Sequence, residues 1–127
     1  MKVLVILNLI LSLNLLYAIE LDRNYLISLG YTEEYAGAIN LRSQNLTSIK
    51  SDTFKGYTKL EFLYLSQNYL NSIEPTTFQD LASLKELHLD NNNIGSLDSN
   101  TFKGLNSLIE LHLWGNKIRN LNDPFVF

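Results

Sequence analysis

The sequence of 127 residues contains no cysteine. No disulfide can form within the chain, although small domains outside the cell generally use disulfides to compensate for a modest hydrophobic core. Proline is scarce as well, with 2 residues. The fold must therefore be held together by packing and hydrogen bonding alone.

Basic charge is not in excess. The chain has 10 lysines and arginines against 13 aspartates and glutamates, which gives a formal net charge of −3 at pH 7. Nucleic-acid binding generally requires a clustered basic surface, so this composition argues against a nucleic-acid partner. The glycines form no phosphate-binding loop, and we predict no cofactor.

Only the N-terminus carries a long apolar run. Met1 and Lys2 give a short basic start, residues 3–16 are mostly apolar, and Ala18 offers a small residue for cleavage. This order is typical of a secretory signal peptide, which we assign to residues 1–18. A buried N-terminal helix and a retained signal anchor are the alternatives. We predict no membrane span, because a span needs about 20 apolar residues and no second apolar run follows.

A repeat of 24 residues organises the rest of the chain. Residues 63–70 read LYLSQNYL, residues 87–94 read LHLDNNNI and residues 111–118 read LHLWGNKI, while residues 39–46 are a weaker copy, INLRSQNL. A phenylalanine recurs at the same spacing, at positions Phe54, Phe78 and Phe102. A fixed period of this length indicates stacked supersecondary units that share one core.

The pattern resembles the extracellular class of leucine-rich repeat that has 24 residues per repeat, because aliphatic, asparagine and phenylalanine positions recur together. The resemblance covers residues 36–127. It implies an α/β-type repeat solenoid, a leucine-rich repeat horseshoe with a parallel β-sheet on its concave face and irregular or 3₁₀ segments on its convex face. The repeats then occupy residues 38–127, about three and a half coils of which the last is incomplete.

Residues 19–37 break the period and are the predicted N-terminal cap. Family members usually cap this end with a cysteine-rich hairpin, so a cap without cysteine must pack apolar side chains against the first coil. The side chains expected to do so are Tyr25, Leu26, Ile27, Leu29, Tyr31 and Tyr35.

Each repeat predicts a short strand followed by a turn. Leu63 and Leu65 are two residues apart, so both side chains point to one side of a strand and the alternate residues point to the other. The asparagine of the turn can both donate to and accept from the backbone of neighbouring coils, which predicts a hydrogen-bonded ladder. Its members are Asn68, Asn92 and Asn116, with Gln44 in the equivalent position of the first coil.

Function is expected on the outward face of the strands. Neighbouring strands lie about 4.8 Å apart, so their outward residues form one continuous surface. Aromatic side chains with arginine and carboxylates are typical of protein-binding surfaces. The predicted ligand-binding residues are Arg42, Phe62, Tyr64, Ser66, Glu86, His88, Asp90, Glu110, His112 and Trp114.

Two histidines on this face raise the question of a metal. His88 and His112 fall in one column beside Glu86 and Glu110, a set of residue types that suits a divalent metal or a pH-sensitive contact. Exposed histidines beside acids are common without a metal, and the sequence shows no residues that would orient such ligands, so we predict no metal site.

Catalysis is not predicted. Ser66, His88 and Asp90 lie on neighbouring strands, but nothing around Ser66 resembles a strained nucleophile turn. We therefore predict that the protein is not an enzyme.

The chain has one glycosylation sequon, Asn45-Leu46-Thr47, and we predict a glycan at Asn45. A chance triplet in an asparagine-rich chain is the alternative. A glycan would fit a chain that carries a secretory leader.

These features predict a secreted or cell-surface binding module, on the extracellular side of the plasma membrane, that recognises a protein or glycoprotein ligand through its concave face. The resemblance implies a receptor, adhesion or matrix protein. The alternative is a structural fragment of a longer receptor ectodomain whose binding surface lies in other coils. The sequence stops inside a repeat, which favours a fragment or self-association through an uncapped C-terminal coil.

Overall fold

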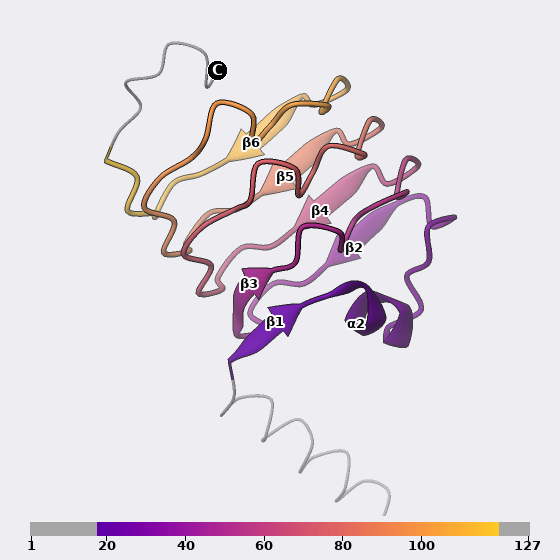
Figure 1. Cartoon of the computed structure of the whole chain (residues 1–127), viewed down its shortest axis with the longest axis horizontal. Helices are drawn as coiled ribbons and strands as arrows, with labels where there is room; N and C mark the ends of the chain where they lie inside the picture. The colour runs from indigo at the N-terminus through magenta and orange to yellow at the C-terminus, as the bar shows by residue number, and fades with distance from the viewer. Residues whose placement is uncertain (1–17, 120–127) are drawn as a thin grey trace, which may run out of the picture.

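The computed structural model describes residues 18–119, which form a stack of coils around one apolar core (Figure 1). The predicted leader, apart from Ala18, and the predicted uncapped end at residues 122–127 lie outside the described residues. The elements are β1 (Ile19–Leu21), α2 (Arg23–Ser28), β2 (Ala38–Asn40), β3 (Leu46–Ile49), β4 (Phe62–Tyr64), β5 (Glu86–His88) and β6 (Glu110–His112).

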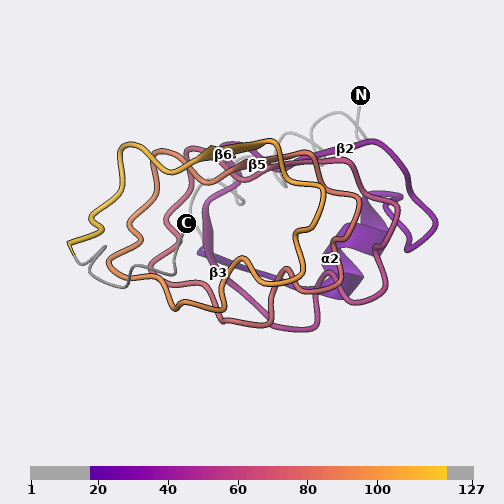
Figure 2. The same cartoon turned by 90° about the horizontal axis from the view of Figure 1, so that it is seen from above.

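Four of the strands form one parallel sheet in the order β2-β4-β5-β6. Equivalent residues of successive repeats are register partners, so Ile39, Leu63, Leu87 and Leu111 lie side by side. Figure 2 shows this sheet along one side of the coils and β3 on the opposite side. The predicted solenoid with a parallel sheet is confirmed.

The core lies between the sheet and the opposite side of the coils. The rings of Phe54 and Phe78 pack with their centroids 6.1 Å apart, and both are almost fully buried. Backbone N–H groups of Tyr57 and Leu81 donate to the carbonyls of these phenylalanines, at 3.1 and 3.0 Å. The far side of the coils is therefore built from tight turns that hold the phenylalanine column in place.

The asparagine after each strand joins neighbouring coils. Oδ1 of Asn92 accepts the backbone N–H of Leu70 at 3.1 Å, and its Nδ2 donates to the carbonyls of Leu65 and Leu89, both at 3.0 Å. The buried backbone groups at this turn are thus satisfied by a side chain, as the interior of a fold requires. The ladder consists of Asn68, Asn92 and Asn116.

Gln44 does not form the first rung of this ladder. Its side chain is exposed, and Nε2 donates to the carbonyl of Arg42 at 3.1 Å instead of reaching into the coil. The Gln44 backbone N–H donates to Oδ1 of Asn68 at 2.9 Å. The expectation that Gln44 occupies a rung was therefore wrong, because its longer amide lies outside the turn that an asparagine fills.

The segment before the repeats packs on the first coil. β1 pairs with β3 in parallel, which makes a second, two-stranded sheet on the far side from the main sheet. Leu21 and Leu26 are fully buried, and Tyr25, Tyr31 and Tyr35 are partly buried against the core. Together with the partly buried Ile19, these side chains cover this end of the stack.

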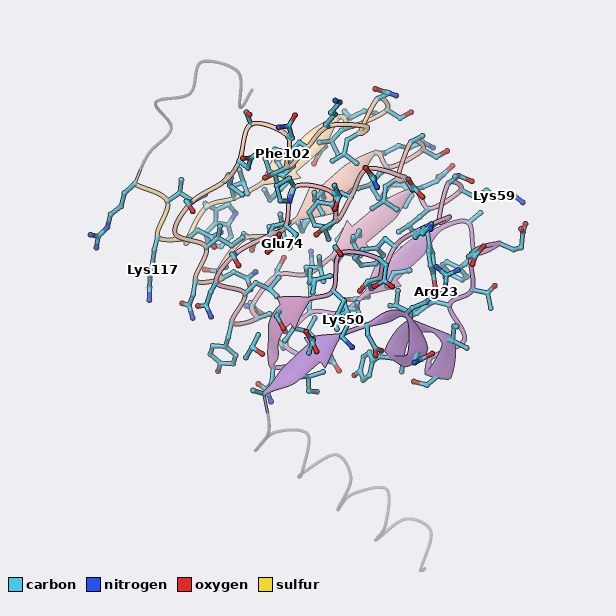
Figure 3. All side chains as sticks on the ribbon, in the orientation of Figure 1. Arg23, Lys50, Lys59, Glu74, Phe102 and Lys117 are labelled. Atoms are coloured by element: carbon cyan, nitrogen blue, oxygen red, sulfur yellow. The ribbon has the colours of Figure 1, made fainter. Side chains whose placement is uncertain are left out.

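Two of the expected capping residues do not contribute. Ile27 and Leu29 are each 49% exposed. α2 has only 6 residues, of which Leu26 is buried and Tyr25 is partly buried against the core, so Ile27 and the following Leu29 are left on the solvent side. Arg23 at the start of α2 adds a polar link, since Nη1 donates to the carbonyl of Lys55 at 2.6 Å (Figure 3). Among residues 18–119, no helix is long and apolar enough to cross a membrane.

Candidate functional site

The register of the main sheet brings three rings into one column on the face that points away from the core. We call this the outer face of the sheet. Tyr64 on β4 is the partner of His88 on β5, which is the partner of His112 on β6. The Tyr64 and His88 rings meet edge to face at 4.8 Å, and the two imidazoles stack at 4.0 Å with an interplanar angle of 10°. The repeat thus places three ring-bearing side chains in van der Waals contact across three strands.

Arg42, two residues after the end of β2, extends this column. Its guanidinium carbon lies 4.7 Å from the centroid of the Tyr64 ring, a cation–π distance. Nη2 lies 3.1 Å from Nδ1 of His88. A guanidinium can only donate, so Nδ1 accepts this hydrogen bond and the proton of a neutral His88 lies on Nε2. We call the set Arg42, Tyr64, His88 and His112 the outer column.

Carboxylates lie beside the outer column. The Tyr64 hydroxyl donates to Oε2 of Glu86 at 3.3 Å. Oε2 of Glu110 lies 3.3 Å from Nε2 of His112. One ring nitrogen of each histidine and one Glu110 oxygen all lie within 4.8 Å of one another. These three residue types are ligands for zinc and related divalent ions.

Burial and neighbouring charge shift two pKa values in the outer column. The pKa of His88 is lowered, chiefly because burial disfavours the charged ring and further because His112 and Arg42 lie close by. The pKa of the Tyr64 hydroxyl is raised by burial, with Glu86 adding to the shift. Both groups are consequently neutral near pH 7, and the face presents them as hydrogen-bonding groups rather than charges.

The exposure expected for Ser66 and Asp90 was wrong. Their residues are only 3% and 7% exposed, and the Ser66 hydroxyl donates to Oδ1 of Asp90 at 2.7 Å. Each stands directly before a residue in the left-handed region, Gln67 with φ 59° or Asn91 with φ 54°. The chain turns there, so the two side chains face each other between coils instead of facing solvent. Nδ1 of His88 lies 4.0 Å from the same Asp90 oxygen.

The left-handed turn is a column in its own right that sequence reasoning missed. Ser43, Gln67, Asn91 and Gly115 recur at the repeat spacing, and all have φ between 54° and 72°. A Cβ at Gly115 would meet Oδ1 of Asn91 at 2.5 Å, so a larger residue there would have to displace this side-chain amide. The asparagine and glycine at equivalent positions were the available signal, because these residues tolerate the left-handed region best.

The remaining predicted residues lie around the outer column. Trp114 is 63% exposed and borders a shallow hollow of about 320 Å³ over the ends of the strands, together with Arg42, His88 and His112. Phe62 is half-buried at the start of β4, with Nζ of Lys85 5.9 Å from its ring centroid. The structure therefore gathers these aromatic and charged side chains on one face of the sheet.

The sequon lies elsewhere, on the far side of the coils. Asn45 is half-buried directly before β3, and its backbone carbonyl accepts the N–H of Ile19 at 3.0 Å. The hydroxyl of Thr47 donates to the Ile19 carbonyl at 3.4 Å. Glycosylation at Asn45 stays a prediction.

Comparison with known proteins agrees with the architecture. A search of the curated proteins found none that matches this chain. The family described as leucine rich repeat matches residues 38–94 and 82–126, which together span more than half of the sequence. The chain therefore belongs to the leucine-rich repeat family.

Proposed function

We propose that this chain recognises a protein or glycoprotein ligand outside the cell through the outer face of its four-stranded sheet. A protein-binding role in general follows from membership of the leucine-rich repeat family. The specific proposal rests on one observation, the outer column. Its side chains contact one another through one cation–π pair and two ring–ring contacts, and they lie beside the exposed Trp114.

The outer column suits binding because its side chains are already ordered. Tyr64 is held between Arg42 and His88, and its hydroxyl is bonded to Glu86. Ordering a free side chain at an interface costs about 0.5–1.5 kcal/mol, so a pre-ordered column retains more of its contact energy on binding. Trp114 supplies a large rigid surface of the kind that dominates binding energies at interfaces.

Site-specific photo-crosslinking tests which face binds. A photoreactive phenylalanine analogue replaces Trp114 in one variant and Tyr69 in the control, because Tyr69 is also an aromatic residue with high exposure, 54%. Both proteins are irradiated on the cells that produce the natural chain, and crosslinked polypeptides are identified by mass spectrometry. A specific partner crosslinked from position 114 and not from position 69 supports the proposal, whereas the reverse pattern overturns it.

The affinity of the captured partner gives a second measurement. Trp114→Ala should weaken its binding by about 30-fold or more, which corresponds to the roughly 2 kcal/mol of a central interface residue. Tyr69→Ala is the matched control and should leave the affinity unchanged. Equal affinities for the two variants would place the binding surface away from the outer face.

The extracellular location is a separate part of the proposal, supported by the leader-like residues 1–18 and the sequon. The natural protein should begin at Ile19 when its N-terminus is sequenced from the medium or cell surface. Enzymatic removal of N-linked glycans should reduce its mass if Asn45 is modified. A cytosolic protein that retains Met1 would contradict this location.

A further inference from the structure

We propose that His88, His112 and Glu110 form a binding site for a divalent transition metal ion of the zinc type. The inference does not depend on the proposed function. One ring nitrogen from each histidine and one carboxylate oxygen lie within 4.8 Å of one another on adjacent strands. Two imidazoles and one carboxylate are a donor set that zinc accepts while keeping a fourth position open.

An unsatisfied polar atom points to the same place. Nε2 of His88 is buried and has no hydrogen-bond partner among the described residues. Oε2 of Glu86 lies 3.4 Å away, which is longer than a good hydrogen bond, so this carboxylate makes only a weak contact with the nitrogen. Buried polar atoms in native proteins are almost always paired, and an unpaired one calls for an explanation such as an ion. A metal bound to Nε2 would satisfy this atom.

The stacking of the rings directs both histidines to the same side. Nε2 of His88 faces Glu86 at 3.4 Å, and Nε2 of His112 faces Glu110 at 3.3 Å. Glu86 and Glu110 are register partners, so both nitrogens lie toward the same end of their strands. A ring nitrogen binds a metal in the plane of its ring, so an ion at this end of the strands would meet Nε2 of His88 first, and His112 and Glu110 would turn out of their present positions to complete the site.

Binding requires the side chains of His112 and Glu110 to move toward Nε2 of His88, and the two imidazoles to leave their parallel stack. Zinc bonds to nitrogen and oxygen are about 2.0–2.2 Å long, so ligand atoms around one ion are closer together than 4.8 Å. The side chains of Glu110 and His112 are 55% and 35% exposed, which leaves them room to rotate. His88, at 13%, is the fixed ligand toward which the other two move.

The surroundings of His88 fit a ligating imidazole in one respect and oppose it in another. A metal on Nε2 places the ring proton on Nδ1, which lies 4.0 Å from Asp90 Oδ1, a carboxylate fixed by Ser66. A carboxylate that accepts this proton holds a ligating histidine in the correct tautomer, and Asp90 would do so once the two atoms approach to hydrogen-bond distance. Arg42 now donates to the same Nδ1, so it must withdraw when metal binds. Arg42 is thus a built-in competitor of the metal.

The test uses the purified full chain without a histidine tag. Co²⁺ serves as the spectroscopic probe, because a strong visible absorption reports a four-coordinate site, and Zn²⁺ displaces it in a calorimetric titration. Glu110→Gln and His112→Gln should each weaken Zn²⁺ binding by at least about tenfold, the lower end of what even an orienting partner contributes. Arg42→Gln should tighten binding, and this opposite sign distinguishes the site from general surface attraction.

The matched control is Glu74→Gln, since Glu74 is an exposed carboxylate in the coil after β4 (Figure 3). It should leave the affinity unchanged. Circular dichroism confirms that each variant is folded, and the exposed Glu110 keeps the test decisive even if a histidine variant fails to fold. A Co²⁺ spectrum identical to the hydrated ion, or equal affinities for Glu110→Gln and Glu74→Gln, would overturn the proposal.

Discussion

Removing the ladder asparagines one at a time should destabilise the fold in an order that their hydrogen bonds determine. Asn68→Ala should cost the most free energy of unfolding, followed by Asn92→Ala and then Asn116→Ala. The order follows from which backbone groups lose a partner and which keep one. Repeat stability is a sum of neighbouring interfaces, so each substitution reports on its own junction.

The cost at Asn92 is moderate because its two shorter carbonyl partners are shared with the neighbouring rungs. The carbonyl of Leu65 keeps the amide of the preceding rung at 2.9 Å, and the carbonyl of Leu89 keeps that of the following rung at 2.8 Å. The N–H of Leu70 loses the acceptor it has at 3.1 Å. One buried unsatisfied donor and two weakened carbonyls amount to about 2–4 kcal/mol.

Asn68 carries more. Its Oδ1 accepts two backbone N–H groups, those of Gln44 at 2.9 Å and Leu46 at 3.1 Å, and its Nδ2 donates to the carbonyl of Leu41 at 2.9 Å. Three backbone groups lose this partner, which raises the expected cost to about 3–5 kcal/mol. Asn116 is only part-buried, so water replaces its bonds and the cost falls to about 1–2 kcal/mol.

Urea unfolding followed by far-ultraviolet circular dichroism measures these costs. Asn71→Ala is the control, because its side chain is exposed and its loss should stay within about 0.5 kcal/mol. If Asn68→Ala does not fold, Asn68→Asp retains the acceptor oxygens and should fall between wild type and the alanine variant. Equal costs along the ladder, or the largest cost at Asn116, would refute the reasoning from shared carbonyls.

Three further predictions use the same unfolding measurement. Phe78→Ala should cost about 3–5 kcal/mol, since the ring is fully buried between coils; an unchanged midpoint would contradict the core assignment. Gly104→Ala should destabilise, because φ is 93° and a Cβ would overlap the carbonyl of Gln79, whereas Gly95→Ala, with open space around it, should not. With chelator present, the free energy of unfolding should fall as the pH drops through 6.5, because His88 takes up a proton in the unfolded chain but resists protonation in the folded one, where its pKa is lowered. His88→Gln should reduce this dependence on pH. If the variant and the wild type lose the same free energy over this pH range, other groups cause the dependence.

The rings of the outer column were predictable, while its surroundings were not. A strict 24-residue period fixes the register, so the alignment of Tyr64, His88 and His112 follows from the sequence alone. Alternation of side chains holds only within a strand, and β4 and β5 end at Tyr64 and His88. Ser66 and Asp90 therefore fall beyond the strands, where the left-handed turn decides their direction.

Long-range side-chain geometry was also beyond the sequence. The period places Arg42 one coil before Ser66, yet its guanidinium reaches diagonally across to the Tyr64 ring and the His88 nitrogen. Such a reach depends on rotamers and on neighbouring bulk, for which periodicity carries no information. The two-stranded sheet β1-β3 was missed for a related reason, since residues 19–21 lie outside the repeat.

A shared set of residues ties the proposed metal to the proposed ligand. His88 and His112 belong both to the outer column and to the metal site, so an ion bound there changes the face that a partner meets. A partner that supplies the open fourth position must bind more tightly with Zn²⁺, and one that packs on the histidine rings must bind more weakly. The factor by which Zn²⁺ changes the affinity for the partner equals the factor by which the partner changes the affinity for Zn²⁺, because coupling between two binding equilibria is reciprocal. Measuring both factors on one sample therefore checks that the two events use the same residues.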